Sequence, residues 1–352
     1  MPGWKGAPDR ILLIQLRHLG DVLLCTPAVR ALRSAFPAAV IDFLSGRLGA
    51  EALAANPHLD RVLLWEPGVQ PQRRLVATLR ERRYDLAIDF PSNPRTAWLT
   101  RLSGARRRVG VRRRGPRHLL YTDAVPAPDP AAYMARQRFA LLEPLGISVG
   151  DSPELALELA VGNDERAFAD EVWRREGLTG DAPVVAISAV SRDPHKQWGA
   201  RRWADVADRL AEQGARILLT GGPGEREQVD AVAERMRHPA VRVDGKTTLR
   251  QLGAIYERCD VWTGNDGGAK HLAAAVGTPT VAVNRWRTGA VWTDAGPGSP
   301  HRYVEAAPPP GCGECEGCER CLGAVTPDAV VREVAEGLER RRAPPASPLA
   351  CG

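Results

Sequence analysis

The sequence predicts an α/β protein made of two Rossmann-like, doubly wound domains. Two observations predict this fold class. Short apolar runs alternate with stretches of helical spacing, which is typical of parallel strands joined by helices. The alternation also begins a second time near residue 183, and a chain of 352 residues is too long for one ordinary core. Because each half carries polar turns after its strands, we expect the two domains to face each other across a cleft.

The first domain is predicted at residues 1–178. The continuous apolar run at residues 10–16 is expected to be its first strand, covered by helices on both faces. Further strands are predicted at 40–44, 61–65 and 85–89, with helices at 22–36, 48–55, 74–82, 130–145 and 163–176.

The second domain is predicted at residues 179–325 and is followed by a capped helix at 326–342. The last segment, 343–352, is rich in proline and alanine and is expected to be disordered. Strands of the second domain are predicted at 183–188, 216–220, 260–263 and 280–283, with helices at 201–213, 225–236 and 249–258 and a short one that ends at Gly277.

The composition is that of a globular protein with an excess of basic residues. Hydrophobic residues make up 44% of the chain and charged residues 26%. No apolar run is long enough to cross a bilayer, and residues 1–10 lack the apolar region of a signal peptide, so a cytoplasmic location is expected. The net charge of +6 favours anionic partners, namely phosphorylated substrates, a membrane surface or nucleic acid.

The rest of the chain is interpreted around residues 259–277. A short apolar strand is followed by a turn in which Asn265 or Asp266 is expected to cap the next helix. A helix N-terminus at the carboxyl end of a strand presents N–H groups and a positive dipole, which together form an anion site. The alternative is an ordinary strand–turn–helix. The residues considered for the anion site are Asp266, Gly267, Gly268 and His271.

Two more loops of the second domain carry polar groups. The loop after its first strand contains Ser188, Ser191 and Lys196, groups of the kind that neutralise a departing diphosphate. Because the chain has only four lysines, a lysine is less expected in a merely solvated loop. The glycine-rich turn at 220–227 places Glu225 where a carboxylate suits a ribose or sugar hydroxyl, and a helix-capping role is about as well supported.

Asp21 follows the first strand at its carboxyl end, where ligands of α/β proteins usually bind. A carboxylate at this place suits a general base. The alternative is that Asp21 caps the helix that begins beside it, and position alone favours the cap. Asp89, at the end of a later strand, is the fallback for the base.

The segment 106–114 contains six arginines in two triplets. The second triplet is Arg112, Arg113 and Arg114. Guanidinium groups suit phosphate and carboxylate, so these residues are candidates for binding an anionic partner. Nucleic acid is the rival partner, but the run lacks the interleaved aromatic residues on which bases stack, and we expect no nucleic-acid partner.

Four clustered cysteines indicate either a metal site or free or disulfide-linked thiols, and both interpretations stay open. Zinc or an iron–sulfur cluster suits four thiolates. The sequence contains no Asp-x-Asp pair of the kind that presents Mg²⁺ or Mn²⁺ to a nucleotide diphosphate, and no P-loop. The four residues are Cys312, Cys315, Cys318 and Cys321.

Taken together, these residues resemble glycosyltransferase family 9, the ADP-heptose:lipopolysaccharide heptosyltransferase family. The resemblance spans roughly residues 10–335 and rests on four motifs in the order that the family has. The motifs are Leu19-Gly20-Asp21, Lys196-x-Trp198, Gly221-Gly222-Pro223-Gly224-Glu225 and Asp266-x-Gly268-x-x-His271-Leu272-Ala273-Ala274.

The resemblance implies a GT-B fold, with an acceptor domain followed by a nucleotide-sugar domain. It implies inverting transfer that requires no metal ion or other cofactor, with Asp21 as the catalytic base. The expected partners are a nucleotide-diphosphate sugar and an anionic glycolipid acceptor held by the second arginine triplet, with peripheral contact at the inner membrane surface. The implied donor-binding residues are Ser188, Ser191, Lys196, Glu225, Asp266, Gly267, Gly268 and His271.

The chain departs from the family pattern at two places. The family usually has Thr or Ser where this chain has Gly267, so only backbone N–H groups remain there for phosphate. After the strand at 280–283 the family commonly continues Phe-Gly-Pro-Thr, and residues 284–287 differ from this, which leaves the donor sugar and base undecided. An alternative function is a basic, metal-cluster-bearing binding protein that keeps the GT-B fold without turnover. Intact Asp21, Lys196 and His271 favour the enzyme.

Overall fold

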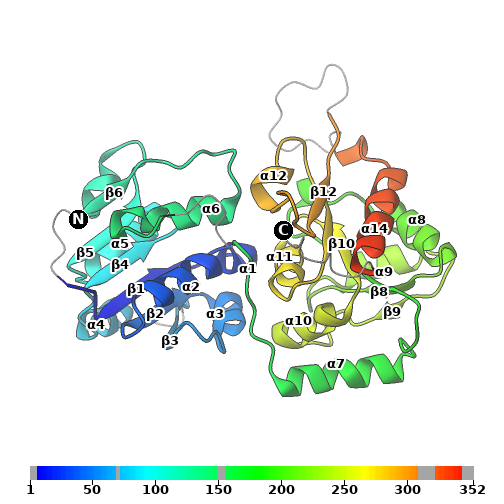
Figure 1. Cartoon of the computed structure of the whole chain (residues 1–352), viewed down its shortest axis with the longest axis horizontal. Helices are drawn as coiled ribbons and strands as arrows, with labels where there is room; N and C mark the ends of the chain where they lie inside the picture. Colours follow the sequence, from blue (N-terminus) through cyan, green and yellow to red (C-terminus); the bar gives the residue numbers. More distant parts are fainter. Residues whose placement is uncertain (1–5, 69–71, 149–154, 308–321, 343–352) are drawn as a thin grey trace, which may run out of the picture. The chain divides into compact units, whose positions relative to one another are not determined.

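The computed structural model describes residues 6–68, 72–148, 155–307 and 322–342. The chain divides into two compact units, residues 1–162 and 163–352. Each unit contains one open, six-stranded sheet with helices around it (Figure 1).

In the first unit the strand order is β3-β2-β1-β4-β5-β6, and all neighbouring strands run parallel. The strands are β1 (Arg10–Ile14), β2 (Val40–Ser45), β3 (Arg61–Leu64), β4 (Leu86–Asp89), β5 (Arg107–Val111) and β6 (Asp123–Val125). The helices are α1 (Leu19–Leu23), α2 (Thr26–Ala35), α3 (Arg47–Leu53), α4 (Gln72–Glu81), α5 (Pro94–Leu102) and α6 (Met134–Phe139), with 3-10 helices η1 (Pro116–Leu120) and η2 (Ala140–Leu145).

Helices cover both faces of the first sheet. Successive side chains of a strand point to opposite faces, and β1 is apolar on both. Ile11 and Leu13 pack with apolar residues of α1, α2 and α6, whereas Leu12 and Ile14 pack with residues of α4 and α5. The predicted doubly wound arrangement is therefore confirmed for this unit.

Prolines explain where the predicted helices of the first unit break. Pro27 lies in the first turn of α2, a position that suits proline but cannot continue an earlier helix, so the predicted helix at 22–36 is two helices. The predicted helix at 130–145 is α6 followed by η2, which contains Pro144. Strands β5 and β6 and helix α5 were not predicted, because arginines interrupt the apolar pattern of β5 and α5 and because β6 is only three residues long.

In the second unit the order is β12-β11-β10-β7-β8-β9, again with parallel neighbours. The strands are β7 (Val184–Ser188), β8 (Arg216–Leu219), β9 (Val241–Arg242), β10 (Val261–Asn265), β11 (Thr280–Val283) and β12 (Arg302–Val304). The helices are α7 (Asn163–Arg175), α8 (Ala200–Glu212), α9 (Arg226–Ala233), α10 (Leu249–Arg258), α11 (Gly268–Ala275), α12 (Gly289–Trp292) and α14 (Pro327–Arg342), with the 3-10 helix η3 (Pro194–Lys196).

The second sheet is also covered on both faces. Apolar residues of α8, α9 and α14 form one cluster with strand residues such as Ile187 and Val283. Helices α10 and α11 lie on the other side of the sheet (Figure 1). Both units are therefore doubly wound, and the predicted fold class is confirmed for each of them.

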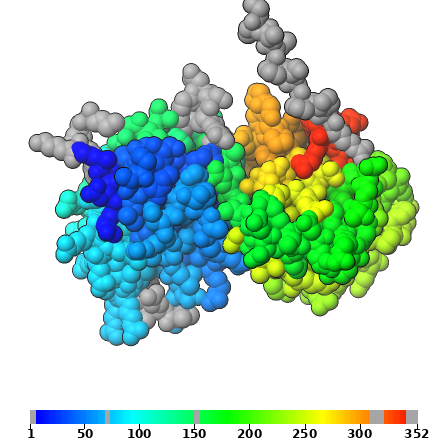
Figure 2. Space-filling view, turned by 60° about the horizontal axis from the view of Figure 1, so that its bottom comes forward, coloured from blue at the N-terminus to red at the C-terminus, as the bar shows by residue number. Residues whose placement is uncertain are grey.

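The boundary between the units lies before α7, whereas the sequence-based boundary was placed after residue 178. Helix α7 packs on α10 of the second unit, where Arg166 donates two hydrogen bonds to Glu257 at 2.8 and 2.9 Å. Figure 2 shows this helix in bright green on the surface of the second unit. Helical spacing alone does not reveal which domain a connecting helix joins. The predicted disordered tail, 343–352, lies outside the described residues.

Each sheet has one topological switch point, where the connections that follow two neighbouring strands run toward opposite edges of the sheet. In the first unit this place lies between β1 and β4, and in the second between β7 and β10. Ligands of open α/β sheets bind at the carboxyl ends of the strands beside such a switch point. The predicted site residues that follow β1, β7 and β10 therefore lie where this fold binds ligands.

Candidate functional site

The turn between β10 and α11 is an open helix N-terminus. Strand β10 ends at Asn265 and α11 begins at Gly268, with Gly267 as its N-cap. A glycine has no side chain to cap the first turn, so the N–H groups there are left for water or a ligand. Together with the helix dipole, these groups are available to an anion, and anion binding at this turn stays a prediction.

The expectation that Asn265 or Asp266 caps this helix is wrong. The Asn265 side-chain oxygen instead accepts hydrogen bonds from Trp203 Nε1 at 3.1 Å and from the Trp198 backbone N–H at 3.3 Å. Its amide nitrogen donates to the Ala189 carbonyl oxygen at 2.6 Å. Asn265 therefore joins β10 to the residues that follow β7. The side chain of Asp266 pairs with lysines and does not cap the helix.

Asp266 lies between two lysines. Lys196 Nζ is 2.8 Å from its Oδ2 atom, and Lys270 Nζ is 2.5 Å from its Oδ1 atom. Lys270 also donates to the hydroxyl of Thr293 at 3.3 Å. Asp266 and Lys270 are both buried. We call Lys196, Asp266 and Lys270 the lysine–aspartate cluster.

The electrostatics of this cluster fix the charge of Asp266. Burial alone raises the pKa of its carboxyl, but the ammonium groups of Lys270 and Lys196 outweigh burial and hold the pKa well below its usual range. Burial lowers the pKa of Lys270, and Asp266 opposes that shift. An ionised Asp266 holds two cations in place and would repel a phosphate, so the cluster presents lysine rather than carboxylate to an anion.

Lys196 is the member of the cluster that reaches solvent, because a quarter of its side chain (25%) is exposed. Its Nζ atom lies 5.6 Å from the ring centroid of Trp292, within the range of a cation–π contact. The ring of His271 packs edge-on against the same tryptophan, with centroids 6.3 Å apart. Trp292 therefore sits beside both residues that were predicted to bind the diphosphate.

His271 is buried and uncharged at neutral pH. Burial, and then the neighbouring charge of Lys270, hold its pKa well below the usual value for histidine. A neutral imidazole has a single N–H to donate. His271 can therefore give a phosphate one ordinary hydrogen bond, and the positive charge at this site comes from the lysines.

The serines after β7 lie at the same end of the second sheet. Ser188 is buried at the end of β7 and is paired with Gly264 of β10. The Ser191 hydroxyl accepts a hydrogen bond from the Asp193 backbone N–H at 3.2 Å, which leaves the hydroxyl proton unused by that bond. Ser188 ends β7, Ser191 and Lys196 follow it, and the α11 N-terminus follows β10, so all of these groups lie at the carboxyl ends of the two strands at the switch point.

Glu225 closes the glycine-rich turn after β8. Its Oε2 atom accepts a hydrogen bond from the Gly222 backbone N–H at 2.7 Å. The residue occupies the N-cap position of α9, but its side chain does not bond to the first turn of that helix. The expected capping role is therefore replaced by a turn-closing one, and contact with a ribose stays a prediction.

Gly267 is not required by local sterics. Its φ of −167° is extended backbone that any residue adopts, and a Cβ atom would meet only the Asn265 carbonyl oxygen, at an ordinary 3.8 Å. A threonine or serine would fit there. The fold thus has room for a side-chain hydroxyl at position 267, but with glycine there this position offers a ligand only its backbone N–H group.

In the first unit, Asp21 is not the cap of its helix. It is the third residue of α1, whose N-cap is His18 with a φ of +62°. The Oδ1 atom of Asp21 lies 3.0 Å from Arg138 Nη2, and the side chain is 18% exposed. Arg138 also donates from Nη1 to the Phe90 carbonyl oxygen at 2.7 Å. An arginine from α6 thus holds a partly exposed carboxylate at the carboxyl end of β1.

The fallback residue Asp89 is fully buried, which makes it a poor base for a bound substrate. Its oxygens accept hydrogen bonds from the Tyr121 hydroxyl at 2.7 Å and the Ser92 N–H at 3.0 Å. Burial raises its pKa to about 6 despite these bonds. Asp89 organises the turn after β4, and Asp21 is the carboxylate that solvent reaches.

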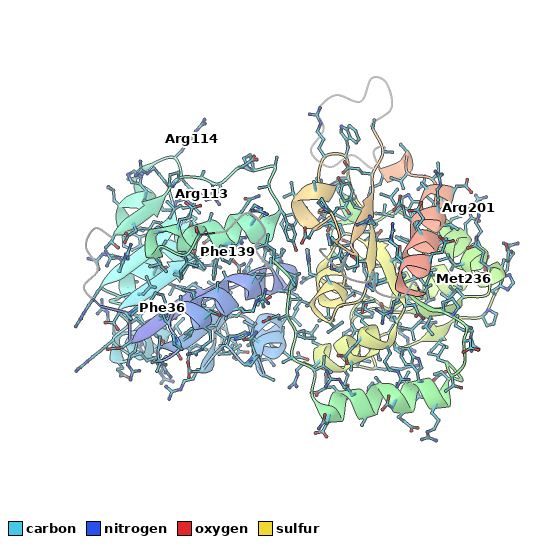
Figure 3. The ribbon with its side chains drawn as sticks, in the orientation of Figure 1. Phe36, Arg113, Arg114, Phe139, Arg201 and Met236 are labelled. Carbon is cyan, nitrogen blue, oxygen red and sulfur yellow. The ribbon has the colours of Figure 1, made fainter. Side chains whose placement is uncertain are left out.

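The arginine-rich segment is divided between structural and exposed residues. Arg107 pairs with Asp123 at 2.8 Å, and Arg108 donates to the carbonyl oxygens of Leu120 and Ala105. The second triplet, Arg112, Arg113 and Arg114, is exposed in the loop after β5. Figure 3 shows Arg113 and Arg114 on this loop, with the side chain of Arg114 clear of the ribbon.

Sequence reasoning missed Lys270, Arg138 and Trp292. Lys270 follows Asp266 by four residues, a spacing that brings side chains together on a helix and that could have been noticed. Arg138 is 117 residues from Asp21 along the chain, and no local pattern links them. Trp292 lies on α12, which was not predicted.

The four cysteines of the predicted metal site lie outside the described residues. Within the described part of the chain, no group of three or more His, Cys, Asp or Glu side chains is placed to hold a metal ion. In the same residues, no helix is both long and apolar enough to span a bilayer.

Residues 72–289 match the model of glycosyltransferase family 9 (heptosyltransferase). The chain belongs to this family. The matched range contains the whole of the lysine–aspartate cluster and the turn before α11, whereas Asp21 precedes it. Family membership identifies the protein as a glycosyltransferase, which decides against the alternative of a binding protein without turnover.

Known relatives agree with this assignment. Lipopolysaccharide heptosyltransferase 3 of Escherichia coli (strain K12) is 27% identical over 287 residues, which are 76% of this chain and 80% of that protein. The solved structure of the glycosyl transferase family 9 from Veillonella parvula DSM 2008 has a TM-score of 0.80 at 24% identity and covers 94% and 97% of the two chains. The E. coli ADP-heptose lps heptosyltransferase II has a TM-score of 0.76 at 23% identity and covers 95% and 100%. The fold is GT-B.

Proposed function

We propose that this glycosyltransferase moves heptose from ADP-heptose to a lipopolysaccharide core or related surface-glycan acceptor, with inversion at the anomeric carbon and without a metal ion. The names of its relatives support lipopolysaccharide as acceptor and ADP-heptose as donor. The observation that carries the proposal is the lysine–aspartate cluster beside the open N-terminus of α11.

The second unit is the proposed donor domain, because it holds the groups that a leaving diphosphate needs. Lys196 supplies an accessible ammonium, and the first turn of α11 supplies N–H groups and the positive end of a dipole. With two lysines and one carboxylate, the cluster carries one net positive charge. These groups neutralise the negative charge that develops on the diphosphate, which is the task that a divalent ion performs in metal-dependent transferases.

The other donor contacts follow from what each residue can offer. Ser188 and Ser191 offer hydroxyl groups, Gly267 and Gly268 offer backbone N–H groups, and His271 offers one N–H. Asp266 acts on the donor through Lys196, which it orients. Glu225 is the proposed partner of the donor ribose, from the turn after β8.

The first unit is the proposed acceptor domain, with Asp21 as the general base. Inverting transfer needs a group that removes a proton as the acceptor hydroxyl attacks the anomeric carbon. Asp21 is held by one of its oxygens and is partly exposed, so the other oxygen is left for the acceptor. Arg112, Arg113 and Arg114 are the proposed contacts to an anionic glycolipid, which places the enzyme peripherally at the inner membrane surface.

The decisive experiment measures transfer directly. The purified full chain is incubated in EDTA with ADP-heptose and a lipopolysaccharide acceptor that lacks its heptoses. We expect ADP release, an acceptor heavier by one heptose residue, and a product whose anomeric configuration is opposite to that of the donor. Transfer from a different nucleotide sugar in a parallel panel would correct the donor. Transfer that stops in EDTA, or that retains configuration, would overturn the mechanism.

A further inference from the structure

The first unit carries a long basic segment that contains no acidic residue. Between Asp89 and Asp123 the chain holds no Asp or Glu, although it has 42 of them in 352 residues. The same stretch holds nine arginines, and we call residues 90–122 the basic segment. The arginines are Arg95, Arg101, Arg106, Arg107, Arg108, Arg112, Arg113, Arg114 and Arg117.

The basic segment also carries the two most exposed large apolar side chains among the described residues. Leu119 of η1 is 73% exposed and Trp98 of α5 is 56% exposed. The two elements pack against each other, so the two exposed residues lie on neighbouring elements of the first unit. Large apolar side chains next to concentrated charge mark an interaction surface more often than isolated ones do.

Packing in the hydrophobic core does not explain why a tryptophan is present at position 98. Helix α5 already buries Ala97 and Leu99, which lie on either side of Trp98 in the sequence. Arg95 and Arg101 are three residues before and after it, a spacing that puts them on the same side of the helix, and both are exposed. The outer face of α5 therefore presents a tryptophan between two arginines.

We propose that this face of the basic segment docks on a bilayer that contains anionic phospholipids, with Trp98 and Leu119 entering the headgroup region. Tryptophan is enriched at membrane–water interfaces, and clustered arginines are attracted to anionic lipid. The charge of the segment selects an anionic surface, and the exposed apolar pair selects a lipid surface over a purely polar polyanion. The inference rests on the proposed function, because it names the surface by which the enzyme meets its lipid-anchored acceptor.

The position of the docking surface suits delivery of that acceptor. Strands β1, β4 and β5 run parallel and adjacent, so their carboxyl ends lie at one edge of the sheet. Asp21 follows β1, α5 follows β4, and η1 follows β5. The two elements that carry Trp98 and Leu119 therefore begin at the edge of the sheet beyond which Asp21 also lies.

The test uses the full chain and vesicles without acceptor. Binding is measured by co-sedimentation with vesicles of phosphatidylcholine alone and of equal parts phosphatidylcholine and phosphatidylglycerol. We expect binding to the anionic vesicles only, and we expect it to weaken as salt rises, because salt screens the attraction to arginine. The double variant Trp98→Ser/Leu119→Ser is expected to bind about tenfold more weakly, because it removes the apolar insertion, and Arg101→Gln to bind more weakly by a smaller factor.

A matched control separates this surface from exposed apolar residues in general. Trp286 and Leu48 are also exposed, at 39% and 46%, and lie outside the basic segment. The variant Trp286→Ser/Leu48→Ser should bind vesicles as the unaltered chain does. Melting temperatures of both double variants should stay unchanged, since all four side chains are exposed. Equal loss in the two double variants, or no loss in either, would overturn the proposal.

Two further readouts distinguish this inference from its rivals. Sedimentation velocity without lipid would reveal a second copy as the occupant, because Trp98→Ser/Leu119→Ser would then shift the oligomer and leave vesicle binding unaffected. Transfer to a water-dispersed acceptor fragment should proceed equally in that variant and in the unaltered chain. Vesicle binding without any transfer would overturn the proposed function alone, and transfer without vesicle binding would overturn the docking surface alone.

Discussion

The carboxyl edges of the two sheets differ in how their charged groups are held. At the second sheet, Asp266, Lys270 and His271 are all buried, and Lys196, a quarter exposed, is the member of the cluster that reaches solvent. At the first sheet, Asp21 is partly exposed and the second arginine triplet lies in solvent. A small diphosphate is bound most effectively by fixed groups whose geometry is set before it arrives. A large glycolipid needs long-range attraction and an open surface instead.

Replacing the proposed base should have the largest effect. In Asp21→Asn the side chain keeps its size and still accepts a hydrogen bond from Arg138, but it no longer takes up a proton. We expect kcat to fall by roughly 10²–10⁴, with little change in donor affinity or melting temperature. Steady-state kinetics and calorimetry check this. Asp129→Asn, an exposed residue of the same unit, is the control, and a kcat close to normal in Asp21→Asn would move the base elsewhere.

Disrupting the lysine–aspartate cluster should lower the free energy of unfolding. Asp266→Asn leaves the buried ammonium of Lys270 without its carboxylate, and losing one partner of a buried pair costs about 3–5 kcal/mol. The double variant Asp266→Asn/Lys270→Met removes the stranded charge, so it should recover part of that loss. Denaturant unfolding of the two variants measures both effects. A single variant as stable as the unaltered chain would show that the pair is not needed for folding.

Lys196 should affect the donor more than the fold. It is the partly exposed member of the cluster, and Lys196→Ala removes the proposed charge-assisted contact with the diphosphate, worth about 1.5–3 kcal/mol. Calorimetric titration with ADP should therefore show weaker binding. Lys246→Ala removes an exposed lysine of the same unit and serves as the matched control. Equal ADP affinity in the two variants would place the diphosphate elsewhere.

The arginine triplet should affect the acceptor and spare the donor. In Arg112→Gln/Arg113→Gln/Arg114→Gln, the acceptor KM should rise and its dependence on salt should flatten, because the screened attraction has been removed. The donor KM should not move. Acceptor titrations at several salt concentrations test this. An unchanged salt dependence would mean that these side chains are only a solvated surface.

The sequence predicts local features of the site better than it predicts contacts across the chain. The strand–turn–helix around Gly267 and Gly268 was predicted because glycines and an apolar run specify it within one short segment. The pairing of Asp21 with Arg138 was not predicted, because the two residues lie on separate helices that meet only in the folded unit. The pairing of Asp266 with Lys196, 70 residues away in the sequence, was missed for the same reason, whereas its pairing with Lys270 is local and its four-residue spacing could have been noticed.

Acid should affect the two units in opposite directions, which sharpens the comparison between them. His271 keeps a pKa well below its ordinary 6.5 because of burial and Lys270. As pH falls below 6.5, His271 binds a proton in the unfolded chain but stays neutral in the folded second unit. The folded state of this unit therefore loses stability relative to the unfolded state. His301 acts in the same direction, since burial lowers its pKa to about 4. The slope for one such group is at most about 1.4 kcal/mol per pH unit.

Asp89 gives the first unit the reverse dependence. Burial raises its pKa from 3.8 to about 6, so between these values the folded unit binds a proton that the unfolded chain releases. Stability from this group is present below the unfolded value and is lost as pH rises through 6. From pH 6 to pH 4 the first unit should therefore gain from Asp89 while the second loses through His271.

Hydrogen exchange, corrected for the intrinsic rate at each pH, measures the two units separately in one sample. We expect protection of β10 and α11 to fall on acidification and protection of β4 to be maintained or to rise. His271→Gln should reduce the loss in the second unit, whereas His238→Gln, on an exposed turn, should leave it unchanged. Asp89→Asn should abolish the gain in the first unit. If both units lose protection together on acidification, the expected opposite dependence is wrong. Such a result would indicate that the two units unfold in one shared step and not separately.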